Sequence, residues 1–149
     1  MSGPQRPGTA DSYRLERFVA AQDAAGTYQR ALAELRAGRK ASRWMWFIFP
    51  QVAGLGFSAM AQRFAISGLA EARAYLGHPV LGPRLRECTE AIAAVDDGTA
   101  DRILGPVDAM KLRSCMTLFA AAAPEEAVFG DVLTRYFDGE PDEATLARL

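Results

Sequence analysis

The feature that most constrains the fold of this 149-residue chain is the helical spacing of its apolar residues. Apolar side chains recur at intervals of three and four residues along most of the sequence, which places them on one side of an α-helix. The most regular stripe consists of Leu81, Leu85, Cys88, Ile92 and Val95. No stretch alternates convincingly between apolar and polar residues, as a half-buried strand would. The pattern predicts an all-α protein, a compact bundle of about seven to nine short helices.

Local start and stop residues divide this pattern into separate helices. A first helix would follow Asp11 or Ser12 and carry Gln22 on its apolar stripe. A second would begin near Thr27 and stop at Gly38, because glycine is the usual residue just past a helix end. Further helix starts are expected at Ser58, Pro79, Thr99, Asp108 and Pro124.

Length and composition indicate one globular domain behind a short tail. A chain of this length typically buries ~70% of its unfolded surface, and 50% of its residues are hydrophobic. Residues 1–11 are rich in Gly, Pro and small polar side chains, so we expect a disordered tail there. Residues 12–149 contain no linker long enough to separate two domains, which predicts a single mainly α-helical domain. The sequence does not define an oligomeric state.

The sequence carries no signal for membrane insertion or secretion. No apolar run approaches the ~18 residues of a membrane span, and the first residues lack the apolar core of a signal peptide. Cys88 and Cys115 lie on apolar helical stripes without metal-ligand spacing, as reduced core thiols do. We therefore expect a cytoplasmic protein without a membrane partner.

Much of the chain resembles the bacterial domain-of-unknown-function family 1810. The segments that carry the resemblance are LERFVAAQ, YQRALAELRAGRK, WMWFIFPQ, GLG, ARAYLGHPVLGPRLREC, KLRSCMTLF and RYFDGEP. The resemblance spans residues 13–149 and implies a compact, mainly α-helical domain with no established activity. Arg43 stands before WMWF where the family often has His, so an acid–base role there does not carry over. Cys115 replaces the second serine of the family's KLRSSMTLF run.

Several common kinds of site are excluded. The net charge of −1 provides no global attraction for nucleic acid, so we do not expect a nucleic-acid partner. His78 is the only histidine, which rules out a His-rich metal site, and its place before Pro79 suits a helix-capping or surface imidazole. The GLG at residues 54–56 lacks the third glycine and preceding strand of a dinucleotide fingerprint, and is typical of a turn. We expect neither a metal nor a cofactor.

A basic segment leads directly into the aromatic run of the chain. Its cations are Arg36, Arg39, Lys40 and Arg43. Cations beside aromatic rings can hold phosphate while a base stacks on the rings. On this basis the candidate ligand-binding residues are Arg39, Lys40, Trp44 and Trp46. The alternative is a solvated loop that leads into core aromatics. Residues 44–49 fit a helix or a strand, and in both the rings face more than one surface, so we expect at least one to line a cleft.

Two glutamines are further candidates for ligand binding. Gln22 lies on an apolar stripe, and Gln51 follows the aromatic run. A buried amide without partners costs ~1–3 kcal/mol. Those partners are either backbone groups or a polar ligand with a donor–acceptor edge.

The segment VDAMKLRSCMTLF supplies a third group of candidates. Asp108, Lys111 and Ser114 are three residues apart, so a helix places them near one another. Arg113 would point ~160° away from the apolar stripe and cannot converge with Lys111 on one ligand. Lys111 and Ser114 are therefore the better pair, and a helix N-terminus nearby would favour an anion. The alternative is an Asp108–Lys111 surface ion pair.

These candidates support a first hypothesis of ligand binding. The aromatic run would leave one face to a pocket completed by Gln22, Gln51 and Lys111. Such a pocket would bind, or act on, a nucleotide-like anion such as an ADP-ribose or NAD derivative, with Arg39, Lys40 and Lys111 holding phosphate. A faint similarity to NADAR-type proteins, which are linked to NAD and ADP-ribose chemistry, points the same way.

The sequence leaves open whether such a site is catalytic. In an enzyme, Asp108 or Glu87 would serve as the base. A second hypothesis is a non-catalytic interaction module that presents the basic loop at residues 36–43 to a protein or nucleic acid. A deep pocket would favour the first hypothesis, and a flat basic face the second.

Overall fold

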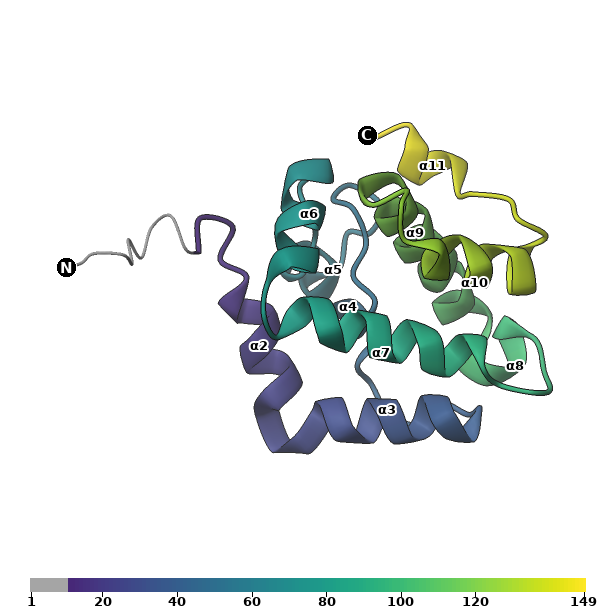
Figure 1. The fold of residues 1–149 in the computed structure, drawn as a ribbon. Helices are drawn as coiled ribbons and strands as arrows, with labels where there is room; N and C mark the ends of the chain where they lie inside the picture. The colour runs from purple at the N-terminus through teal and green to yellow at the C-terminus, as the bar shows by residue number, and fades with distance from the viewer. Residues whose placement is uncertain (1–10) are drawn as a thin grey trace.

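The computed structural model describes residues 11–149. Its regular secondary structure in this range is helical, and the one β feature is an isolated bridge between Val52 and Ile66. The helices are α2 (Glu16–Asp23), the 3-10 turn η1 (Ala24–Gly26), α3 (Thr27–Ala37), α4 (Met45–Ile48), α5 (Ala59–Arg63), α6 (Leu69–Gly77), α7 (Leu81–Ala93), α8 (Ala100–Leu104), α9 (Pro106–Ala122), α10 (Ala127–Phe137) and α11 (Glu143–Leu146). In Figure 1, α7 crosses the front of the bundle above α3, and α9 and α10 lie behind and above its far end. The predicted all-α fold is confirmed.

Helix α9 forms the centre of the bundle. It packs against α6, α8, α10 and α11, and its side chains Leu112, Met116 and Phe119 are fully buried. The sequence predicted a start at Asp108, but the helix begins at Pro106, because a proline at the first position has no N–H that needs a partner. Asp108 therefore lies in the first turn, where a carboxylate interacts favourably with the positive end of the helix dipole.

Three of the predicted helix boundaries are present as expected. Ser58 and Thr99 cap α5 and α8, since each hydroxyl accepts a hydrogen bond of 3.1 Å from the backbone N–H three residues later. Gly38 follows α3 with a φ of 73°, in the left-handed region that glycine adopts without strain.

Three other predicted starts differ from the structure by a few residues. The first helix was expected to follow Asp11 or Ser12 and begins at Glu16, because residues 11–13 form a turn. The helix expected at Pro79 begins at Leu81, because the Nδ1 atom of His78 accepts the N–H groups of Leu81 and of the residue before it, at 3.2 and 3.1 Å. The imidazole thus caps the helix, as its position predicted. Helix α10 begins at Ala127 because Pro124 lies in a turn.

The aromatic run forms a short helix. Its sequence had been compatible with a helix or a strand. Helix α4 occupies four residues of it and packs against α2. The flanking rings of Trp44 and Phe49 are fully buried, and Phe47 is nearly so. Trp46 is the one ring of the run that is only half-buried. The run therefore contributes both to the core and to a surface.

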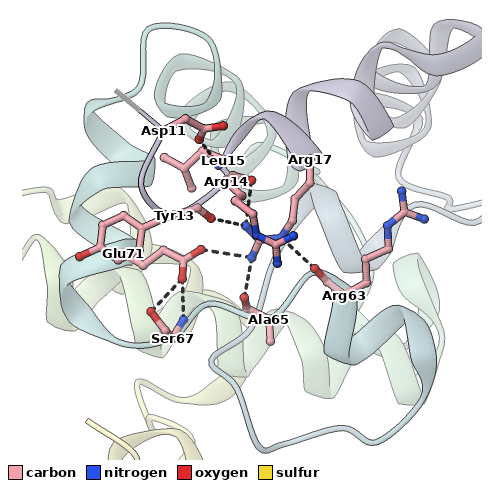
Figure 2. Close-up of polar contacts among 9 residues, drawn as sticks. All are labelled: Asp11, Tyr13, Arg14, Leu15, Arg17, Arg63, Ala65, Ser67 and Glu71. Carbon is pink, nitrogen blue, oxygen red and sulfur yellow. Dashed lines mark hydrogen bonds and ion pairs between the residues drawn. The ribbon is translucent and has the colours of Figure 1, made fainter. Parts of the chain in front are cut away.

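Arg17 ties the start of α2 to the segment between α5 and α6 (Figure 2). Its guanidinium donates to the carbonyls of Arg63 and Ala65, each at 2.8 Å, and to the Glu71 carboxylate at 3.2 Å. The other oxygen of Glu71 accepts the N–H and the hydroxyl of Ser67, at 2.9 and 2.8 Å. Both charges of the pair are largely buried, and removing one partner of such a pair typically costs ~3–5 kcal/mol.

The predicted disordered tail at residues 1–11 lies, up to residue 10, outside the described residues. Asp11 belongs to a turn that leads into α2: its carbonyl accepts the N–H of Arg14 at 2.9 Å, and its carboxylate accepts the N–H of Leu15. That residues 12–149 form a single domain stays a prediction.

Candidate ligand-binding groove

A groove of about 410 Å³ lies between α4, the loop at residues 51–58 and the first turns of α9. Four of the candidate ligand-binding side chains line it: Trp46, Gln51, Lys111 and Ser114. An adjoining hollow of about 260 Å³ shares Trp46 and Gln51 with the groove. Packing thus brings together candidates from the aromatic run and from α9, which are far apart in the sequence.

Trp46 presents a half-buried ring to the groove and carries two cations. The Lys111 ammonium lies 5.0 Å from the ring centroid, and the Arg43 guanidinium lies 6.0 Å from it. A cation over an indole face is attracted by the quadrupole of the ring, by ~0.5–2 kcal/mol depending on desolvation. Trp44 is fully buried and does not line the groove.

Asp108 lies between the only two lysines of the chain. Its Oδ2 atom is 3.1 Å from the Nζ of Lys40, and its Oδ1 atom is 3.3 Å from the Nζ of Lys111. All three side chains are largely shielded from water, so salt screens these ion pairs less than it screens exposed ones. The Asp108–Lys111 pair considered from the sequence is therefore present. Two ammonium groups share one carboxylate, which leaves an excess positive charge beside the groove.

Glu34, on α3, holds the basic segment in place. Its Oε1 atom accepts the backbone N–H groups of Ala41 and Ser42, at 2.8 and 3.0 Å, and the indole N–H of Trp44 at 2.8 Å. Its Oε2 atom accepts the Ser42 hydroxyl at 2.7 Å. Burial by itself would raise the pKa of Glu34, but these donors outweigh it and lower the pKa to about 2. The ionised carboxylate therefore fixes the segment that brings Lys40 to its partner.

Gln51 is among the residues that line both hollows. Within residues 11–149, no protein group forms a hydrogen bond with this amide, although it is partly buried. An amide offers an acceptor oxygen beside a donor nitrogen, which matches the hydrogen-bonding edge of a base or another amide. The groove thus contains a polar group with unused hydrogen-bonding capacity.

Gln22 lies outside the groove, in the core, where protein groups satisfy its amide. Its Nε2 atom donates to the Phe47 carbonyl at 2.8 Å and to the Tyr75 hydroxyl at 3.3 Å. Its Oε1 atom accepts from Arg84 at 3.2 Å. The side chain is 1% exposed. The two kinds of partner considered for a buried glutamine were backbone groups and a polar ligand. In the structure the partners of Gln22 are one backbone carbonyl and two protein side chains.

Glu87, Arg39 and Lys40 also lie outside the lining of the groove. Glu87 is on α7 and accepts a hydrogen bond from the Tyr28 hydroxyl. Its other oxygen lies 3.4 Å from the Arg36 guanidinium. These contacts join α7 to α3, and neither helix contributes a residue to the lining of the groove. Of the two candidate bases, only Asp108 is next to a residue that lines the groove.

The start of α11 contributes a groove residue that sequence reasoning missed. Asp142 lines the groove, accepts the Ser114 hydroxyl at 3.3 Å and caps α11 by accepting the N–H of Thr145 at 3.0 Å. Arg113 does not line the groove; its guanidinium donates to the carbonyls of the two residues before Asp142, at 3.1 and 3.0 Å. An Asp before a short helical segment is an N-cap signal, but no local pattern shows that this cap meets Ser114.

Phe57, Val107 and Met110 line the groove as well, and the sequence did not identify them as site residues. They are 82%, 67% and 70% exposed. The sequence indicates only that Val107 and Met110 lie off the apolar stripe of α9, so that the core does not require them to be apolar. We call these three side chains the apolar rim.

Within residues 11–149, no group of three or more His, Cys, Asp or Glu side chains is arranged to hold a metal ion. None of the helices in this part of the chain is long and apolar enough to span a membrane.

The architecture and the groove define a compact all-α protein with tryptophan and lysine side chains at its candidate site. The chain belongs to the family described as Protein of unknown function (DUF1810), which matches it over residues 12–149. The crystal structure of the conserved hypothetical protein Rv1873 from Mycobacterium tuberculosis is similar, with a TM-score of 0.90 and 49% sequence identity over 93% of this chain and 98% of that chain. No curated protein matches. The family resemblance seen in the sequence is confirmed.

Proposed function

We propose that the groove binds a small organic anion that joins a flat ring system to a phosphate or carboxylate, as a nucleotide or an ADP-ribose derivative does. The observation that carries the proposal is the Lys111 ammonium at 5.0 Å from the ring centroid of Trp46, within a groove of ligand size. At this position Trp46 can stack on a flat ring of the ligand, and Lys111 can pair with its anionic group.

The anionic group of the ligand pairs with Lys111 and Arg43. One contact of the Lys111 ammonium is with Asp108, and its other N–H donors remain for a ligand. Within residues 11–149, no carboxylate lies within 4.0 Å of the Arg43 guanidinium. Because Lys40 also neutralises Asp108, the carboxylate does not cancel the charge of Lys111.

The ring system of the ligand is held by Trp46 and Gln51. Stacking of a base on an aromatic side chain contributes ~1–3 kcal/mol and tolerates many bases. The Gln51 amide would select among them, because its donor and acceptor pair with the edge of the ring. A ligand that left this amide without a partner would bind less tightly.

The contacts of the basic segment favour this proposal over an interaction module built on residues 36–43. Arg36 pairs with Glu87, and Lys40 pairs with Asp108. These two cations therefore already have carboxylate partners within the fold. A flat basic face for a protein or nucleic acid would leave them available.

We further propose a cytoplasmic location. The support is that Cys88 and Cys115 are free thiols, each buried on a different helix. Proteins of oxidising compartments usually pair their cysteines.

Thermal unfolding with AMP, NAD, ADP-ribose or inorganic phosphate tests the proposal, because a ligand that binds only the native state raises the melting temperature. We expect at least one of the three nucleotides to raise it. Lys111→Met should abolish that rise and cost less than ~1 kcal/mol of stability, since Asp108 keeps Lys40 as its partner. The loss should shrink with added salt, which already weakens the contribution of the charge.

A matched control is Arg30→Met, which also removes one positive charge but from the exposed face of α3. Its guanidinium donates only to Ala25 and Thr27, in the adjoining turn of the chain and away from the groove. It should leave the rise intact. Arg113 is not a suitable control, because its guanidinium holds the segment before α11. The proposal fails if none of the three nucleotides raises the melting temperature, or if Lys111→Met and Arg30→Met respond alike.

A further inference from the structure

Exposed apolar side chains gather around the groove. The five large apolar side chains that are most exposed within residues 11–149 are Phe57, Val107, Met110, Leu146 and Leu149. The first three form the apolar rim of the groove. Leu146 and Leu149 do not line the groove. Arg148, which is close to them in sequence, donates from its guanidinium to the Gly54 carbonyl at 3.1 Å, in the loop that forms one wall. Single exposed apolar residues are common, but a cluster of them marks an interaction surface.

The fold itself does not account for this cluster. Val107 and Met110 lie in the first turns of α9, on the side away from the buried stripe, and any polar residue would serve the helix equally well there. Phe57 precedes the cap of α5 in a loop and is 82% exposed. Its ring contributes little to the core at that exposure. A partner that covers these side chains would explain why apolar residues occupy exposed positions.

The cations beside the rim, Lys111 and Arg43, have N–H donors that are not fully used. Lys111 uses part of its hydrogen-bonding capacity on Asp108, and Arg43 has no carboxylate within 4.0 Å among residues 11–149. The carboxylate of Asp108 is already engaged, because both of its oxygens pair with lysines. Asp142 uses its Oδ2 atom to accept from Ser114 and from the cap of α11. The unused N–H donors next to the rim therefore match the acceptor oxygens of carboxylate groups.

We propose that the apolar rim docks an acidic segment of a partner protein. One apolar side chain of that segment packs among Phe57, Val107 and Met110, and neighbouring Asp or Glu side chains pair with Lys111 and Arg43. Apolar anchors inside a charged margin are the usual anatomy of such interfaces. The proposal goes beyond small-ligand binding, because it depends on the rim and not on Gln51 or on stacking against Trp46.

A selection of random short peptides displayed on phage, with the full-length protein as bait, tests this. We expect the enriched peptides to combine Asp or Glu with Leu, Phe or Trp. A synthetic copy of one such peptide should bind in a fluorescence anisotropy titration. Met110→Glu should raise its Kd by at least about tenfold, because it replaces an apolar contact with a charge that repels the peptide. Phe57→Ser should have a similar effect without a change of charge.

The matched control is Ala20→Glu, which adds the same charge on the exposed face of α2. It should leave the Kd of the peptide unchanged. Gln51→Leu alters the amide proposed to hold the nucleotide and leaves the apolar rim intact. It should weaken the response to nucleotides and leave the Kd of the peptide unchanged, so failure of one proposal is distinguishable from failure of the other.

Three results would overturn the docking proposal. The first is a selection that enriches no peptide, or only basic ones. The second is an acidic peptide that binds Met110→Glu as tightly as it binds the unmodified protein. The third is a dimer in sedimentation velocity that Met110→Glu dissociates, because a second copy of the chain would then cover the rim.

Discussion

Replacing Glu34 by Gln tests whether one carboxylate organises the segment between α3 and α4. The carboxylate accepts four hydrogen bonds, from two backbone N–H groups, the Ser42 hydroxyl and the Trp44 indole. A glutamine keeps one acceptor oxygen but places an NH₂ group against at least one of these donors. We expect Glu34→Gln to lower the stability of the folded state and to loosen the basic segment.

The pKa of Glu34 sets the size of the effect. A carboxyl group whose pKa falls from its usual 4.5 to about 2 stabilises the folded state above both values. Without solvent screening, this difference between the two pKa values corresponds to ~3 kcal/mol of stability, since each pKa unit is ~1.4 kcal/mol. The side chain is only partly buried, so solvent screening reduces the contribution, and we expect a loss of ~1–2 kcal/mol near neutral pH.

The sign of the pH dependence follows from the lowered pKa. The contribution of Glu34 is fully present above the unfolded pKa near 4.5 and is lost as the pH falls through that value toward about 2. Glu34→Gln has no group to titrate there. The difference in stability between the two proteins should therefore be largest near neutral pH and should shrink between about pH 4.5 and 2.

Urea unfolding followed by circular dichroism, at neutral and at acidic pH, measures this difference. Glu90→Gln is the matched control, because Glu90 is exposed on α7, and it should change stability by less than ~0.5 kcal/mol. The reasoning would be refuted by a Glu34→Gln protein that is as stable as the parent near neutral pH. It would also be refuted by a stability difference that stays constant down to acidic pH.

Two further predictions concern the core. Gln22→Leu should cost ~1–3 kcal/mol in urea unfolding, because it leaves the buried Phe47 carbonyl without its donor and removes one acceptor from Arg84; no loss of stability would show that the amide is dispensable for folding. Cys88 and Cys115 should not react with a thiol reagent in the native protein, since burial raises the pKa of Cys88 to about 12 and that of Cys115 well above its usual value. Rapid labelling without denaturant, measured by mass, would contradict the buried positions.

The sequence by itself determined the helices and many of their boundaries. Helical spacing, a serine or threonine cap and a glycine stop act between residues within one or two turns, so consecutive residues encode them. The caps at Ser58 and Thr99 and the stop at Gly38 could be predicted for this reason. Where two local signals competed, as at Asp108 after Pro106, the predicted cap lay three residues beyond the observed N-cap, Gly105. The aromatic run was too short for its spacing to distinguish a helix from a strand.

Only the tertiary structure decided which candidates form the groove. The sequence presented Gln22 and Gln51 as equivalent amides, and packing placed one among core partners and the other beside Trp46. It likewise brought Lys40 to Asp108, and Asp142 to the groove from the far end of the chain. These contacts join residues far apart in sequence. Their formation depends on how whole helices pack against one another, and no local spacing encodes that arrangement.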